Sequence, residues 1–185
     1  MRIYVQHRSK LTHKGIKMKY ICCLFAAFVI CSSAFSQSMI ESKYEKYIVR
    51  KAVELDASAR EIFSSDLMPN AKTKIEYLYI TADTTIGTGE DFPPHKHEYE
   101  EIFLFLGTDP QDTANLGAEV EFWLGQGDER EKVVINTSSA IYVAPGVVHF
   151  PQTWKNVKRP VMLMIIMPTT GESKMEPVAI SDPEK

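Results

Sequence analysis

Cysteine is almost missing from this chain of 185 residues, and the little there is lies near the N-terminus. All three cysteines, Cys22, Cys23 and Cys31, precede residue 37. The rest of the chain can therefore form no disulfide bond. Any metal site in it must also do without thiolate ligands, which excludes the cysteine-rich structural zinc sites.

Acidic residues are absent from the first 36 positions, which carry six basic ones. An apolar run at 21–30 is followed by small residues that end in Ala34-Phe35-Ser36. This order is typical of a secretory signal peptide, here residues 1–36 with Met18 as an alternative start. The apolar run is shorter than the ~20 residues that cross a bilayer, so an uncleaved anchor is the weaker interpretation. We expect a periplasmic or secreted protein with no membrane attachment after cleavage.

Basic residues are scarce after this leader. Six of the 21 Lys and Arg residues lie in it, which leaves 15 against 24 Asp and Glu, a net charge of −9. Such an acidic product argues against nucleic acid or an anionic membrane surface as a partner. The remaining 149 residues suit one domain of ordinary size.

Histidine is scarce as well, because only His95, His97 and His149 follow the leader. In an extended segment His95 and His97 point to the same side, and Glu101 adds a carboxylate at the start of an apolar run. His149 follows the turn Ala144-Pro145-Gly146. Three imidazoles and one carboxylate suit a divalent transition metal. A His-x-His pair can also arise by chance, but here every histidine after the leader falls in the set.

The residues around these histidines resemble the two motifs of the cupin superfamily. Gly89, His95-Lys96-His97 and Glu101 are similar to the first motif, and residues 144–149 to the second. The resemblance covers roughly residues 75–168. It implies an all-β fold, a single jelly-roll barrel of the double-stranded β-helix type. It also implies that His95, His97, Glu101 and His149 hold one metal ion, with Zn, Mn, Fe and Ni as the candidates.

The chain departs from the cupin motifs at several positions. Gly107 follows Glu101 by six residues where the family has seven, and Pro145 is shifted by one. Ser138 and Thr153 stand where the family has glycine and asparagine. None of these is an expected ligand, so they bear on the subfamily more than on the metal.

Such a site in an exported protein predicts the binding of a small oxygen-rich molecule on the metal. Whether the protein is an enzyme stays open, and we lean towards a metal-dependent oxygenase, isomerase or lyase. The alternative is a module that binds a sugar or organic acid without turnover. No catalytic residue can be named from the sequence. The resemblance permits each of these activities and selects none.

Strand patterns recur along residues 74–168, the predicted barrel. In the strand that begins at Glu101, Phe103 and Phe105 should point inward with it, while Ile102 and Leu104 face outward. An apolar outer side needs a cover, and we expect either the N-terminal extension 37–73 or a homodimer partner. Further strands are predicted at 74–81, 118–124, 132–136, 140–143 and 161–167.

The segments that flank the barrel are less informative. Within the extension, 47–49 and 52–55 are candidate strands, and 56–63 a helical turn or two capped by Asp56. Residues 169–185 form a polar tail that we expect to be flexible, with Pro177 opposing regular structure.

Several residues are candidates for lining the pocket: Tyr79, Phe103, Phe105, Phe150 and Gln152. For Tyr79 the preferred interpretation is packing on the sheet with its hydroxyl in solvent. Glu119 and Glu121 should face outward, because a register that buried both without partners would be costly. In that reversed register they would be acid–base candidates.

Overall fold

The computed structural model describes residues 42–55, 59–168 and 174–180. The chain divides into two units, 1–45 and 46–185, and only the second is described at length below. The predicted signal peptide, the tail residues 169–173 and 181–185, and the expected cap Asp56 lie outside the described residues. No helix within the described ranges is long and apolar enough to span a bilayer.

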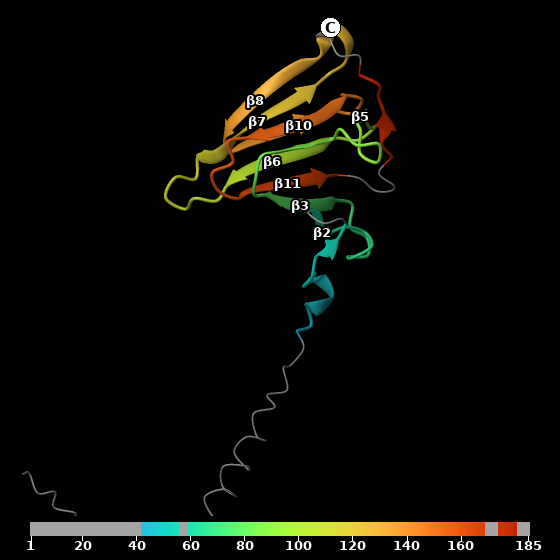
Figure 1. Ribbon diagram of the computed structural model, residues 1–185. Helices are drawn as coiled ribbons and strands as arrows, with labels where there is room; N and C mark the ends of the chain where they lie inside the picture. The colour runs from blue at the N-terminus through green and yellow to red at the C-terminus, as the bar shows by residue number, and fades with distance from the viewer. Residues whose placement is uncertain (1–41, 56–58, 169–173, 181–185) are drawn as a thin grey trace, which may run out of the picture. The chain divides into compact units, whose positions relative to one another are not determined.

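The first sheet has six antiparallel strands in the order β1-β2-β3-β11-β6-β9. Strand β11 lies inside this sheet and pairs along its length with β3 on one side and with β6 on the other. The strands, coloured from teal to red in Figure 1, are β1 (Val53–Glu54), β2 (Ala59–Phe63), β3 (Lys74–Ile80), β6 (Glu101–Gly107), β9 (Ser139–Val143) and β11 (Val161–Met167).

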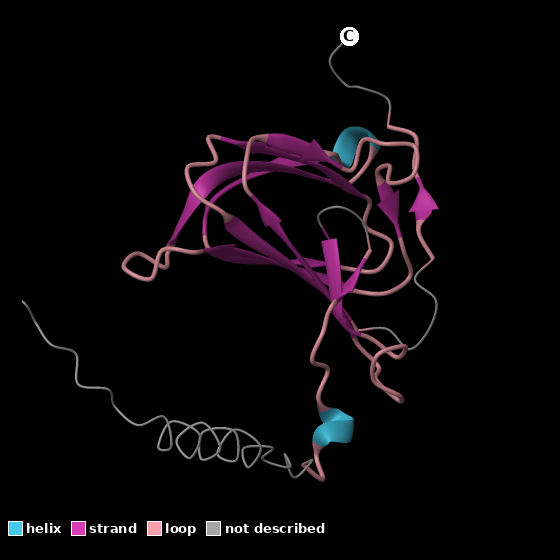
Figure 2. Ribbon diagram, turned by 60° about the horizontal axis from the view of Figure 1, so that its bottom comes forward, coloured by secondary structure: helices cyan, strands magenta, loops and turns pink. Residues whose placement is uncertain are grey.

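The second sheet has the order β12-β5-β10-β7-β8, and β4 also pairs with β10. Figure 2 shows the strands of the barrel curving around a common interior. All described pairings are antiparallel, so the predicted all-β, two-sheet jelly roll is confirmed. The strands are β4 (Thr84–Ile86), β5 (His95–Lys96), β7 (Asn115–Leu124), β8 (Glu131–Thr137), β10 (His149–Lys155) and β12 (Glu176–Pro177), with short 3-10 helices η1 (Glu45–Tyr47) and η2 (Gly127–Glu129).

The core lies between the sheets and is rich in aromatic rings. Strand β6 alternates as predicted: Glu101, Phe103 and Phe105 are buried, and the residues between them are partly exposed. Burial of large side chains supplies most of the favourable free energy of folding. The fully enclosed core side chains include Phe103, Phe105, Leu116, Val120, Phe122, Trp154 and Leu163.

The N-terminal extension differs from the prediction. Residues 59–63 form strand β2 rather than a helical turn, because they pair with β3 and add to the edge of the first sheet. Of the two candidate strands, only Val53–Glu54 is a strand, and it pairs with β2. No strand forms at 47–49. Cross-strand pairing here overrides the local helix preference of Ala59, Arg60 and Glu61.

The tail is also more regular than expected, since Glu176–Pro177 forms β12 against β5. The backbone N–H of Val178 then donates to the carbonyl of Pro94 at 2.9 Å. A proline without an N–H is tolerated there because β12 lies at the edge of its sheet. The expectation that Pro177 prevents regular structure is therefore wrong.

Candidate metal centre

Two short structural features bring the three histidines together. His95 in β5 is the cross-strand partner of His149 in β10. His97 follows two residues later, and its carbonyl accepts a hydrogen bond of 2.8 Å from the N–H of Gly146. That bond ties the turn before His149 to the His-x-His segment. The three rings are buried, and one nitrogen from each lies within 4.8 Å of the other two.

Each histidine ring is oriented by a backbone carbonyl. Nδ1 of His95 lies 2.8 Å from the oxygen of Pro93. Nδ1 of His97 lies 2.6 Å from that of Tyr99, and Nδ1 of His149 lies 3.1 Å from that of Val147. A carbonyl oxygen only accepts hydrogen bonds, so each Nδ1 carries the hydrogen and each neutral ring keeps a lone pair on Nε2. Such carbonyl partners are the usual support of metal-binding imidazoles.

Glu101 completes the donor set against two of the rings. Its Oε2 lies 3.1 Å from Nε2 of both His97 and His149. Nε2 of His149 is nevertheless a buried nitrogen without a hydrogen-bond partner among the described residues. Imidazole nitrogens and a carboxylate oxygen gathered at one buried place are donor atoms that suit a divalent transition metal. The residues therefore fit a divalent cation, and the His95, His97 and His149 cluster can hold one.

The pKa values of the site follow from its burial. Burial lowers the pKa of His95 from 6.5 to about 4, because the apolar surroundings disfavour the imidazolium. Burial by itself would raise the pKa of Glu101, but the contacts with His149 and His97 outweigh it and hold that pKa below its ordinary value. Both directions favour the neutral imidazole and the carboxylate that bind a metal.

Aromatic rings enclose the histidines. Phe150 stacks on His95 with 5.5 Å between centroids, and Phe92 lies 5.2 Å from His95. The ring centroid of Phe103 lies 6.0 Å from that of His149. Tyr99 stacks on His97 at 3.8 Å. The sequence prediction did not include Phe92 and Tyr99, although their places beside the His-x-His pair could have suggested them.

Gln152 lies in the interior beyond His149. It is fully buried, and neither its amide oxygen nor its amide nitrogen has a partner among the described residues. Opposite β7, His149 pairs with Leu124 and Gln152 with Phe122, so Gln152 lies about 7 Å along the strand from His149. A buried amide with both atoms unpaired points to a ligand or water in the interior.

The other predicted pocket residues lie farther away or face elsewhere. Tyr79 is 52% exposed on the outer face of β3, so its inclusion in the pocket is wrong. Phe105 is buried but packs on Trp154 and Phe122, deeper in the core than the histidines. Glu121 faces outward and contacts Lys155 at 2.7 Å, which excludes the reversed register of β7.

A charged group that the sequence did not suggest lies on the inner face of the first sheet. By alternation Lys74 and Glu76 share the side of the buried Leu78 and Ile80. Lys74 pairs with Glu76 and, at 3.4 Å, with Glu61. These are the titratable side chains on the inner face of β2 and β3.

Comparisons with known proteins find remote structural likenesses only. No family model matches the sequence, and no curated protein matches it. Among solved structures, an oxalate oxidase is 14% identical over 72% of this chain and 63% of that one, with a TM-score of 0.46. A cupin-2 domain protein from Rhodospirillum rubrum is 8% identical over 70% of this chain and 74% of that one, at 0.44. A cupin 2 conserved barrel protein from Rhodopseudomonas palustris is 10% identical over 69% and 75%, at 0.42. At this level of likeness the function has to be inferred from the site.

Proposed function

We propose that this chain is an exported metal-binding protein that binds a small oxygen-rich molecule at the histidine cluster. His95, His97, His149 and Glu101 would hold one divalent transition metal ion. The observation that carries the proposal is the contact between each Nδ1 and a backbone carbonyl, which makes Nε2 the nitrogen that each ring can offer to a metal. A buried nitrogen without a donor at His149 supports it.

The bound metal would act as a Lewis acid that polarises an oxygen donor of the substrate. Four protein ligands leave room for such a donor on an ion that accepts five or six. Imidazole and carboxylate ligands are compatible with Zn, Mn, Fe or Ni.

The residues around the cluster would bind and orient the substrate. Phe92, Phe103 and Phe150 give an apolar wall that excludes water. Gln152 offers one N–H donor pair and one carbonyl acceptor, so it suits a molecule that carries a hydroxyl beside a carbonyl. Its unpaired amide would then find its missing partners in the ligand.

Turnover and simple binding differ in their need for an acid or base. Glu119 and Glu121 lie outside the barrel, which leaves Glu61, Glu76 and Lys74 as the inward candidates on the first sheet. We favour an enzyme of the oxygenase, isomerase or lyase type, with a non-catalytic sugar- or acid-binding module as the alternative. Metal-loaded protein assayed with diketones, phenolics and sugar acids, with and without dioxygen, separates the two.

Metal content tests the site directly. Purified wild type should retain about one divalent ion per chain after dialysis, measured by plasma mass spectrometry. His97→Ala and the bulkier His97→Gln should each lose it, with circular dichroism confirming that both variants fold. Lys96→Gln is the matched control, because Lys96 instead pairs with Glu176 at 3.4 Å. Full metal content in both His97 variants would refute the donor set.

Export and self-association complete the proposal. We propose cleavage after residue 36 and a periplasmic or secreted product, which the mass and N-terminal sequence of the exported protein would test. We also propose a homodimer through the outer face of the first sheet, where Leu104 and Met164 are neighbours and Tyr79 and Tyr142 are exposed. Light scattering should show a dimer that Met164→Glu converts to a monomer.

A further inference from the structure

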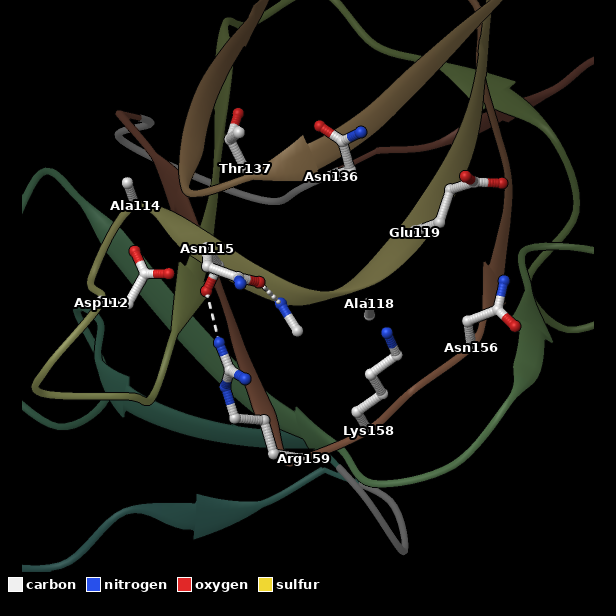
Figure 3. Close-up of a pocket in the computed structure, with 11 residues that line it drawn as sticks. Asp112, Ala114, Asn115, Ala118, Glu119, Asn136, Thr137, Asn156, Lys158 and Arg159 are labelled. Carbon is white, nitrogen blue, oxygen red and sulfur yellow. Dashed lines mark hydrogen bonds between the residues drawn. The ribbon is translucent and has the colours of Figure 1, made fainter.

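A polar cavity of about 780 Å³ lies at the end of the barrel remote from the histidines. Strand β7 spans the distance, since Leu124 at one end pairs with His149 and Asn115 at the other lines the cavity. The walls come from β7, β8 and the loop after β10, as Figure 3 shows. The volume is in the range of small-molecule sites, but the lining is polar.

A bulge in β7 hollows this part of the sheet. The register between β7 and β8 shifts between Asn115 and Val120, and Gly117 in between has a φ of +80°. A Cβ at Gly117 would lie 2.8 Å from the side chain of Arg159, so only glycine lets Arg159 lie this close. Arg159 also donates to the carbonyl of Asn115 at 3.0 Å. The floor of the cavity is thus held in a defined shape, and bulges often mark functional sites.

The cavity presents charges of both signs that the protein does not pair. Glu119 is the cross-strand partner of Lys155, yet Lys155 contacts Glu121 at 2.7 Å instead. Among the described residues, Glu119 has no ion pair, and the ammonium of Lys158 has none either. In Figure 3 the Lys158 side chain extends into the middle of the cavity with Asn156 beside it, while Glu119 and Asn136 lie across the cavity from it.

We propose that this cavity binds a small zwitterion of the amino-acid class. Its carboxylate would accept from Lys158 and Arg159, and its ammonium would donate to Glu119. The amides of Asn136 and Asn156 would add hydrogen bonds to either end. A simple anion would leave Glu119 facing it as a like charge, and a neutral sugar would leave both charges unpaired. None of the lining residues is aromatic, so a sugar would also lack a ring to stack on.

Titration calorimetry of the purified chain with L-glutamine, acetate and glucose tests the proposal. L-Glutamine should bind with a dissociation constant near or below about 1 mM, and acetate and glucose at least about tenfold more weakly. The side-chain amide signals of Asn136 and Asn156 in nuclear magnetic resonance spectra should shift in the same titration. No binding of L-glutamine at about 10 mM, or equal binding of glucose, would overturn the proposal.

Variants of Glu119 and Lys158 test the role that the proposal gives to each of these charges. Glu119→Gln and Lys158→Gln should each weaken L-glutamine binding about tenfold or more, as expected for charge-assisted hydrogen bonds. Glu121→Gln is the matched control, because it lies on the same strand face but outside the cavity lining. His97→Ala should leave L-glutamine binding unchanged, which separates this site from the metal centre. Unchanged affinity in Glu119→Gln would refute the assigned role of that carboxylate.

Discussion

The two ends of strand β10 hold their polar groups in opposite ways. At the start, His149 and Gln152 are fully buried, and the ring of His149 is oriented by a backbone carbonyl. Beyond its end, Asn156 and Lys158 are exposed around an open cavity. Buried polar groups without partners are costly and therefore indicate a tightly held ligand. Exposed charges are solvated in any case, so they suit a ligand that exchanges readily.

The buried end should be much more sensitive to substitution than the exposed one, and a core ring gives the largest effect. Phe103 is fully buried, 5.2 Å from Phe122 and 5.8 Å from Phe150. Phe103→Ala should lower the free energy of unfolding by about 3–5 kcal/mol, measured by urea denaturation. Leu104→Ala, on the outer face of the same strand, should cost less than half as much. Equal losses of unfolding free energy in the two variants would show that the packed interior around the histidines contributes no more to stability than the outer face of β6.

Gly87 tests how the aromatic wall is positioned. It has a φ of +81°, and a Cβ there would lie 2.5 Å from the side chain of Phe150, the ring that stacks on His95. Gly87→Ala combines a strained backbone with overpacking, so we expect a loss of about 2–4 kcal/mol and weaker metal retention.

Gly89→Ala is the control for that variant, because nothing lies within 4 Å of a Cβ at Gly89. Its effect should be within about 0.5 kcal/mol. Thermal unfolding of the two alanine variants measures whether Gly87→Ala loses more stability than Gly89→Ala. A stable Gly87→Ala protein with full metal content would mean that Phe150 can move without disturbing the site.

Much of the buried end could be predicted from the sequence, because strand side chains alternate with a period of two. That period places Glu101, Phe103 and Phe105 on one side, and the spacing of His95 and His97 follows the same rule. Gln152 could be proposed as a pocket residue, but its unpaired amide is visible only in three dimensions. The carbonyls that orient the rings could not be predicted, since they depend on the path of the backbone through residues 93–99 and 147–149.

The exposed end and the edges of the sheets were largely hidden from sequence reasoning. Strand β2 forms because β3 offers it an edge, not because of its own preference. The bulge at Gly117 and the contact of Lys155 with Glu121 are set by tertiary structure and not by the local sequence. The cavity near Lys158 depends on the bulge and on this contact, and no sequence motif predicts either of them.

Acid should destabilise the metal-free protein through His95. Folding holds the pKa of His95 at about 4, below its ordinary 6.5. As the pH falls below 6.5 the unfolded chain takes up the proton first, so stability is present above 6.5 and is lost toward pH 4. The two values set an upper limit of roughly 3 kcal/mol on this loss of stability. Urea denaturation of chelator-treated protein at pH 7 and pH 4.5 measures the loss.

His95→Gln provides the comparison, because glutamine does not titrate in this range. The variant should lose part of the pH dependence while the wild type keeps it. A wild type whose metal-free stability is the same at both pH values would show that His95 is not held neutral by burial.

The smallest effect is expected at the exposed end, where Glu121 contacts Lys155 at 2.7 Å and Lys132 at 3.3 Å. The hydrogen bond from Lys155, with a weaker contribution from Lys132, lowers the pKa of Glu121. Both lysine side chains are exposed, at 43% and 39%, so the attraction is screened. Glu121→Gln should therefore change the free energy of unfolding by less than about 1 kcal/mol, and less still in about 1 M salt. Thermal unfolding at low and high salt checks both values. A loss as large as that of Phe103→Ala would mean that the two ends of β10 do not differ in the way their burial implies.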